Sequence, residues 1–104
     1  MYQVILVTCP NKKEARKIAT FLVKERLASC VNIIDRLESF FWWQKKIDYA
    51  KEVLLIIKSK KKNFSKVVKN IKRLHSYKVP EIIALKIIAG EKKYLNWIDE
   101  SLGI

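Results

Sequence analysis

The chain has 104 residues, which suits a single domain built around one hydrophobic core. Half of the residues are hydrophobic and 31% are charged, a balance that excludes an intrinsically disordered chain. The net charge of +12, from 22 Lys and Arg against 10 Asp and Glu, allows either an anionic partner or a solvated lysine-rich surface. Because the lysines are scattered over helix faces and turns, we favour the solvated surface and expect one domain over residues 1–104.

Residues 2–9 form a continuous apolar run with a polar end, which predicts a central strand. The chain opens directly into this run without a basic leader, so we expect no secretory signal. No stretch approaches the ~20 apolar residues of a membrane span, so we expect no membrane partner. Cys9 and Cys30 both fall in predicted strands and lack CxxC spacing, which favours free thiols in a reducing, cytoplasmic compartment.

The next segment has the pattern of an amphipathic helix. Asn11 predicts the helix cap, with Glu14 three residues later in a capping-box-like position. Apolar residues then recur at three- and four-residue steps, the spacing of one buried stripe. The stripe comprises Ala15, Ile18, Ala19, Leu22, Val23 and Leu27.

Residues 28–58 contain two arms rich in β-branched and aromatic residues around the polar Gln44-Lys45-Lys46, which predicts a β-hairpin. Each arm is about twice the usual strand length of ~5–6 residues. The four consecutive aromatics at residues 40–43 would project from both faces near the tip. Because exposed aromatic patches are rare on soluble monomers, we interpret the hairpin as an assembly arm.

The second half of the chain predicts a helix over residues 64–74, a strand over residues 82–88 and a short helix from Glu91. The order is therefore β-α-β-β-α-β plus a terminal helix, which places both long helices on one face of a four-stranded antiparallel sheet. Residues 53–57 are apolar without alternation, so both faces of that strand require cover. The open sheet face and the long hairpin predict a homo-oligomer packed sheet against sheet.

Six segments occur in a characteristic order: Thr8-Cys9-Pro10, Ala28-Ser29-Cys30-Val31-Asn32, Ser39-Phe40-Phe41-Trp42-Trp43, Glu52-Val53-Leu54-Leu55, His75-Ser76-Tyr77-Lys78-Val79-Pro80-Glu81 and Tyr94-Leu95-Asn96-Trp97. They resemble the CutA family of divalent-cation tolerance proteins. The resemblance implies an α+β, ferredoxin-like fold similar to that of PII signalling proteins, with a long central hairpin and an extra C-terminal helix. It also implies a cytoplasmic homotrimer assembled through the 28–58 hairpin, with a role in tolerance to copper and other divalent metals. It implies no catalytic reaction, so we expect a non-enzymatic binding protein that needs no metal to fold.

Two positions depart from the family pattern. Members commonly carry Trp-x-Gly-Lys at the hairpin turn, where a left-handed Lys45 would cost roughly 1–2 kcal/mol, and this predicts a different turn type here. The resemblance also implies copper ligands in the first strand and in a His-His pair, positions that here hold Val7 and Leu74-His75. Only His75 remains, with Cys9 displaced by two residues from the strand position and therefore on the same face.

His75 is the only histidine and the candidate metal ligand. Its position at a helix end also suits a cap on the last carbonyls, which is the role that we favour. The candidate set for a small anion or metal complex in a cleft between subunits consists of Cys30, Glu52, Lys58, Tyr77 and Glu81. Taken singly, Glu52, Lys58, Tyr77 and Glu81 favour structural pairing, because buried charges need partners. For Cys30 a soft metal ligand and a small buried residue both stay open, and for Cys9 we favour the buried residue.

Two other functions share some of these features. An RNA-recognition module has the same strand order, surface aromatics and basic charge, but its Gly-containing aromatic strand motif is missing and the sheet face is aliphatic. We therefore expect no nucleic-acid partner. A PII-like sensor of a small metabolite is the second alternative. Gly90 and Gly103 are the only glycines, which excludes enzymes that bind phosphate through a Gly-rich loop. With one histidine, the chain also offers few nucleophile–base pairs for catalysis.

Overall fold

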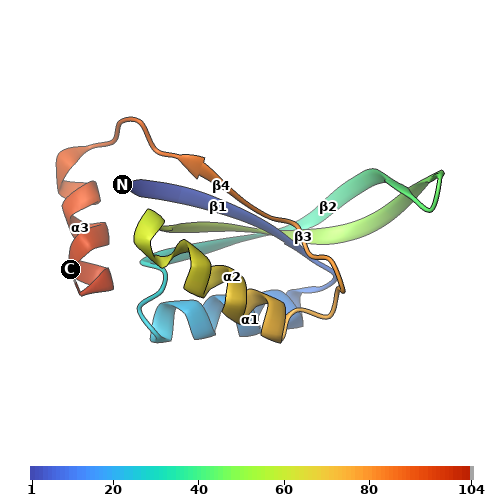
Figure 1. The fold of residues 1–104 in the computed structure, drawn as a ribbon, viewed down its shortest axis with the longest axis horizontal. Helices are drawn as coiled ribbons and strands as arrows, with labels where there is room; N and C mark the ends of the chain where they lie inside the picture. Colours follow the sequence, from blue (N-terminus) through green and yellow to red (C-terminus); the bar gives the residue numbers. More distant parts are fainter. Residues whose placement is uncertain (104) are drawn as a thin grey trace.

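The computed structural model describes residues 1–103. Its elements are β1 (Tyr2–Cys9), α1 (Lys12–Lys24), β2 (Cys30–Trp43), β3 (Lys46–Lys60), the short 3-10 helix η1 (Lys61–Asn63), α2 (Phe64–Leu74), β4 (Ile82–Lys86) and α3 (Lys92–Leu102). The order confirms the predicted β-α-β-β-α-β chain with a terminal helix (Figure 1).

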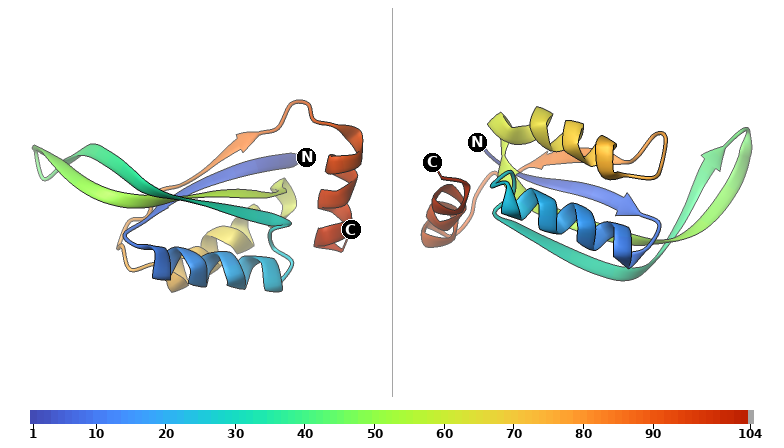
Figure 2. Two further views of the ribbon diagram at one scale, coloured as in Figure 1. Left: turned by 180° about the vertical axis from the view of Figure 1, so that it is seen from behind. Right: turned by 90° about the horizontal axis from the view of Figure 1, so that it is seen from below.

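The four strands form one antiparallel sheet in the order β2-β3-β1-β4, so β1 is central as predicted. The helices α1 and α2 lie side by side on one face of this sheet, and α3 stands at one end of it (Figure 2). This is the predicted α+β, ferredoxin-like arrangement with an extra C-terminal helix.

The start of α1 follows the sequence prediction only in part. Asn11 caps the helix, because its Oδ1 accepts a hydrogen bond of 2.8 Å from the backbone N–H of Glu14. The reciprocal half of a capping box is not formed, since the Glu14 carboxylate points instead toward His75. Val23, which the periodicity placed in the buried stripe, is 43% exposed, whereas Leu22 beside it is fully buried, so Val23 lies at the edge of the stripe.

The hairpin of β2 and β3 extends past the helices and gives the molecule an elongated shape of 44 × 25 × 23 Å (Figure 1). Its turn consists of Gln44 and Lys45 alone, with φ angles of 49° and 66°, and Lys46 already belongs to β3. Positive φ at both central residues is the signature of a type I′ turn, the geometry that matches the twist of paired strands. The expectation that Lys45 avoids the left-handed region is therefore wrong, because the type I′ loop that closes this hairpin places both of its residues there.

The last strand is shorter than predicted. We expected residues 82–88, but β4 ends at Lys86, which pairs with Gln3 of β1. The backbone N–H of Ile87 still donates a hydrogen bond of 3.0 Å to the carbonyl oxygen of Tyr2, which is the first residue of the partner strand β1. The apolar run of residues 82–88 continues past the end of β1, so the length of β1 determines where β4 ends.

The two faces of the sheet differ in cover. On the helix side, Ile5, Val7, Leu55 and Ile57 are fully buried. On the opposite face, Leu54 and Ile56 of β3 are half-buried and Ile83 of β4 is 50% exposed. At the hairpin tip Trp42 is 72% exposed. Within residues 1–103, no helix combines the length and the apolar character needed to cross a membrane.

Candidate metal centre

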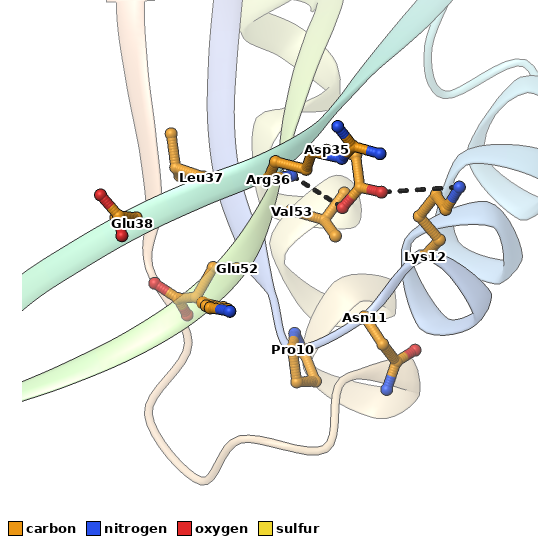
Figure 3. Close-up of a pocket in the computed structure, with 10 residues that line it drawn as sticks. Pro10, Asn11, Lys12, Asp35, Arg36, Leu37, Glu38, Glu52 and Val53 are labelled. Carbon is orange, nitrogen blue, oxygen red and sulfur yellow. Dashed lines mark hydrogen bonds and ion pairs between the residues drawn. The ribbon is translucent and has the colours of Figure 1, made fainter.

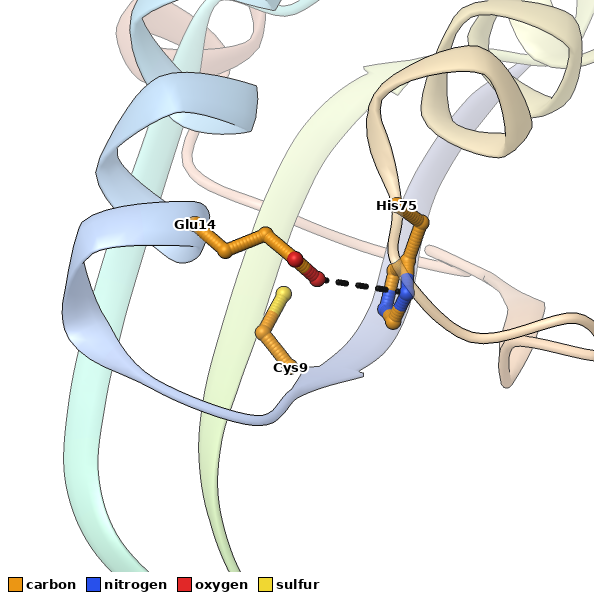
Figure 4. Close-up of side chains that lie close together, drawn as sticks. All are labelled: Cys9, Glu14 and His75. Carbon is orange, nitrogen blue, oxygen red and sulfur yellow. Dashed lines mark ion pairs between the residues drawn. The ribbon is translucent and has the colours of Figure 1, made fainter.

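Three potential metal ligands meet where β1 ends. Cys9 is the last residue of β1, Glu14 lies in the first turn of α1, and His75 directly follows α2. Their side chains point toward one another, and the thiol, carboxylate and imidazole ligand atoms all lie within 4.8 Å of each other (Figure 4). Three segments far apart in the sequence therefore build one cluster.

The cluster is closed to solvent on the Cys9 side. Cys9 is fully buried, and this burial raises the pKa of its thiol to about 12, with a further contribution from the carboxylates of Glu14 and Glu52. The thiol is therefore neutral at neutral pH. The expectation that Cys9 is a small buried residue with a free thiol is confirmed.

The imidazole of His75 has well-defined partners. Its Nε2 lies 2.7 Å from the carbonyl oxygen of Thr8, which can only accept, so Nε2 carries the proton. The Nδ1 atom then accepts the backbone N–H of Tyr77 at 3.0 Å. The backbone N–H of His75 does close the end of α2 on Ile71, but the ring is turned toward β1 instead of capping the helix carbonyls as predicted.

The carboxylate of Glu14 lacks a corresponding partner. Its Oε2 lies 3.3 Å from His75 Nδ1, yet among residues 1–103 this buried oxygen makes no hydrogen bond. Buried polar atoms are normally satisfied, so each exception needs an explanation. A cation between the three side chains would supply the missing partner.

The spacing of the cluster fits a small cation. A tetrahedral zinc ion with bonds of about 2.0–2.3 Å holds its ligand atoms roughly 3.3–3.8 Å apart. The Glu14 Oε2 to His75 Nδ1 separation of 3.3 Å already lies in this range, and the 4.8 Å limit on the other pairs leaves a contraction of about 1 Å. The donor set of one sulfur, one nitrogen and one oxygen also suits zinc or copper.

Two of the candidate residues support this cluster from outside. The ring of Tyr77 packs on the imidazole of His75 with 4.8 Å between centroids, and its hydroxyl donates to Glu52 Oε2 at 2.8 Å. Burial and this hydrogen bond raise the pKa of Tyr77. Glu52 is buried, and its hydrogen bond with Tyr77 gives it the partner expected for a carboxylate among apolar neighbours.

Glu52 also lines a pocket of about 550 Å³ next to the start of α1 (Figure 3). Another part of the pocket wall comes from β2, at an irregular position where Arg36 has a φ of 64° and the pairing register with β3 shifts. Lys12 and Asp35 form an ion pair of 3.5 Å across the rim. The pocket therefore carries both charge signs beside the candidate metal centre.

The remaining candidate residues lie elsewhere. Cys30 and Lys58 are register partners on β2 and β3, and both side chains contact Asn32 Oδ1. Lys58 is six residues from Glu52 along β3, which corresponds to roughly 20 Å. Glu81 is exposed in the segment before β4. The structure thus brings His75, Tyr77 and Glu52 together and places Cys30 and Lys58 away from them. Glu81 precedes Ile82, the register partner of Val7, so it lies at the same end of the sheet, but among residues 1–103 its side chain makes no hydrogen bond or ion pair with the three.

Glu14 is the candidate ligand that sequence reasoning missed. Its capping-box-like position at the start of the helix was sufficient to explain a glutamate there. No residue near Glu14 in the sequence indicates a contact with His75, which is 61 positions further along the chain. The one available signal was that Cys9 ends a strand and Glu14 begins the next helix after a short link, so that both side chains can share one edge of the sheet.

The sequence was compared with known families and structures. The family model "CutA1 divalent ion tolerance protein" matches residues 3–101. The chain belongs to this family. It is 45% identical to the divalent-cation tolerance protein CutA of Thermus thermophilus over 99% of this chain and the whole of that protein. The solved structure of the T. thermophilus protein superposes with a TM-score of 0.96 at 44% identity, covering 97% of this chain and 98% of that chain.

Other CutA relatives correct one expectation. The solved structure from Archaeoglobus fulgidus, 42% identical with a TM-score of 0.95 over 98% of this chain and 99% of that one, is named a periplasmic protein. The rice relative, 42% identical over 94% of this chain and 55% of that protein, is named chloroplastic. The predicted cytoplasmic location is therefore wrong as an inference from the family, because family membership does not fix the compartment.

Proposed function

We propose that this CutA family member is a non-enzymatic homotrimer that binds a divalent metal ion through Cys9, Glu14 and His75. The observation that carries the proposal is the convergence of a thiol, a carboxylate and an imidazole in one buried cluster, with Glu14 Oε2 unpartnered among the described residues. The names of the relatives, which refer to tolerance of divalent cations, support the same reading.

The donor chemistry indicates the class of ion. Three protein ligands leave a fourth tetrahedral position open, and thiolate with imidazole favours copper or zinc over calcium or magnesium. The ion would replace the proton of the Cys9 thiol and take the lone pair of His75 Nδ1, which would have to release the hydrogen bond that it accepts from the backbone N–H of Tyr77. Tyr77, stacked on that ring and anchored to Glu52, would orient the imidazole as an outer-shell support.

The proposal of a homotrimer is supported by apolar surfaces that no other part of the described chain covers. Half-exposed Ile83 and Leu85 on β4 continue the apolar face of Leu54 and Ile56, and exposed aromatics gather at the hairpin tip. A patch of this kind is typical of a protein–protein interface. Cys30 and Lys58 lie on the same face of the sheet, so they remain our candidates for a contact at a cleft between subunits.

Isothermal titration of Zn²⁺ and of Cu²⁺ into the purified oligomer tests the metal site. We expect Cys9→Ala to weaken binding by at least about 100-fold, more than the loss of an outer-shell partner. Cys30→Ala removes the other free thiol, which lies outside the cluster, and is the matched control with unchanged affinity.

Glu14→Gln provides a second variant in case Cys9→Ala folds poorly. It keeps the backbone N–H that caps α1 on Asn11 and removes only the carboxylate charge. Thermal unfolding without metal verifies that each variant is folded. Equal metal affinity in the wild type, Cys9→Ala and Glu14→Gln would remove these residues from the site.

A further inference from the structure

The positive charge of the protein is concentrated in one layer. Residues 12–25 and 61–74, which comprise α1, η1 and α2 with one flanking residue, hold eleven of the 22 cations and two of the 10 acids. This layer therefore carries nine of the twelve net positive charges. The helices lie side by side on the face of the molecule that points away from the open sheet surface (Figure 2).

The cations of this layer form two rows. On α1 the row consists of Lys13, Lys17 and Lys24, spaced four and seven residues apart along one helix side. Across from it, Lys62, Lys66, Lys69 and Arg73 follow the same periodicity through η1 and α2. We name these two rows the basic seam.

The rows face each other where the helices meet. The guanidinium of Arg73 lies 4.9 Å from the ring centroid of Phe21, which is on the α1 side next to Lys17 and Lys24. All seven cations of the basic seam are exposed. Cations four residues apart on one helix are separated by about 6 Å along the axis, and Lys17 and Lys24 by about 10 Å, so the seam is an extended positive surface.

Within residues 1–103, no carboxylate lies within ion-pair distance of any seam cation; the ion pairs formed there involve Lys12, Lys60 and His75. Surface ion-pair networks that stabilise heat-adapted proteins need both signs of charge, so they do not account for the seam. Like charges four residues apart on a helix are destabilising. A surface that costs stability and has no internal partner is suited to an external polyanion.

We propose that the basic seam binds the phosphate backbone of nucleic acid without preference for base sequence. Regularly spaced phosphates complement rows of cations, and phosphate contacts carry no sequence information. A membrane surface fits less well, because interfacial helices expose large apolar side chains, and on the described α1 and α2 only Val23 is of this kind. The expected absence of a nucleic-acid partner was inferred from the sheet face, which is aliphatic and lacks the Gly-containing aromatic strand motif, and from lysines taken as scattered. The sheet face is a different surface, and on the helices the cations are gathered in rows.

Fluorescence anisotropy of a labelled 20-base-pair duplex, measured with the full-length oligomer between 50 and 200 mM salt, tests the proposal. We expect binding that weakens linearly in log–log form, with a slope of about −0.9 for each phosphate contacted. The double variant Lys66→Gln, Lys69→Gln should flatten that slope by roughly 2 and weaken binding at 50 mM salt by at least about tenfold. The matched control Lys92→Gln, Lys93→Gln removes the same charge from α3 and should stay within about twofold of the wild type.

Each alternative outcome is distinguishable. Absence of binding at 50 mM salt overturns the proposal. Equal loss in the seam and α3 variants also overturns it, because diffuse net charge would then be responsible. If vesicles with anionic lipid bind more tightly than the duplex and lose affinity in the seam variant, the partner is a membrane surface and the nucleic-acid assignment is wrong. Circular dichroism of both double variants verifies that these exposed substitutions leave the fold intact.

Discussion

The two faces of β3 carry the same kind of side chain but differ in cover. Val53, Leu55 and Ile57 are buried beneath α1 and α2, whereas Leu54 and Ile56, one position out of phase, lie half-buried on the open face. A strand that is apolar on both faces normally belongs to a sheet covered on both sides. Hydrophobicity therefore indicates that a face needs cover, and the topology decides whether the chain supplies that cover itself.

A charge placed on the open face should have the largest effect on the assembly. Ile83→Lys on β4 changes a side chain that is 50% exposed, and Val23→Lys on α1 changes one that is 43% exposed, so the two variants are matched in chemistry and exposure. If a second copy covers the sheet, the unpaired lysine of Ile83→Lys costs several kcal/mol per subunit and dissociates the assembly. Analytical ultracentrifugation measures the mass.

We expect the wild type and Val23→Lys to sediment as three copies and Ile83→Lys to sediment as one. Two results would contradict this. One is an Ile83→Lys variant that sediments with the same mass as Val23→Lys. The other is a dilute wild type that sediments as a folded single chain, since the open face would then be stable in water.

At the hairpin tip, no other part of the described chain covers either face of the two strands. Lys45 sits at φ 66°, where a Cβ atom costs roughly 1–2 kcal/mol and glycine costs little. We expect Lys45→Gly to stabilise the protein by about 1 kcal/mol in urea unfolding. Lys46→Gly, one residue later and inside β3, should instead destabilise it by about 0.5–1 kcal/mol. Equal effects of the two variants would show that the type I′ turn contributes no strain in solution.

Local patterns were sufficient to predict most of the fold. The helical spacing of α1 and α2, the cap at Asn11 and the long hairpin were all predicted from nearby residues. The features that were missed depend on distant ones. β4 stops at Lys86 because its partner β1 begins at Tyr2, and this limit is set some 80 residues away in the sequence.

In the candidate site, too, single residues could be chosen from the sequence, but their contacts with distant residues could not be predicted. His75 was chosen as the only histidine, and Tyr77 and Glu52 as members of the candidate set for a cleft, and the structure brings the three together. Glu14 was assigned to the helix cap because its local role was sufficient to explain it, and its place as a third candidate ligand became visible only in three dimensions. Cys30 was grouped with this set, although it pairs with Lys58 at the far part of β3. Composition identifies unusual residues, but only the register of the strands shows which of them are neighbours.

The helix α3 provides the subtlest test, because polar contacts fix it to the sheet. Asp99 accepts hydrogen bonds from the Tyr2 hydroxyl at 2.7 Å and from Lys60 Nζ at 2.8 Å. The hydrogen bond from Lys60, followed by that from Tyr2, holds the pKa of Asp99 below its usual range. A carboxyl whose pKa is lower in the folded state contributes stability above its unfolded pKa of about 3.9, and this contribution is lost as the pH falls through the folded value.

Asp99→Asn should therefore be less stable than the wild type at pH 5–7, and the difference should shrink as the pH is lowered toward 2. Urea unfolding across this range at fixed protein concentration measures it. If the difference stays constant down to pH 2, the charge of Asp99 is irrelevant. The packing of buried Ile98 and Leu102 would then hold α3 in place, and α3 would cover its end of the sheet in the same apolar way as α1 and α2 cover the helix face.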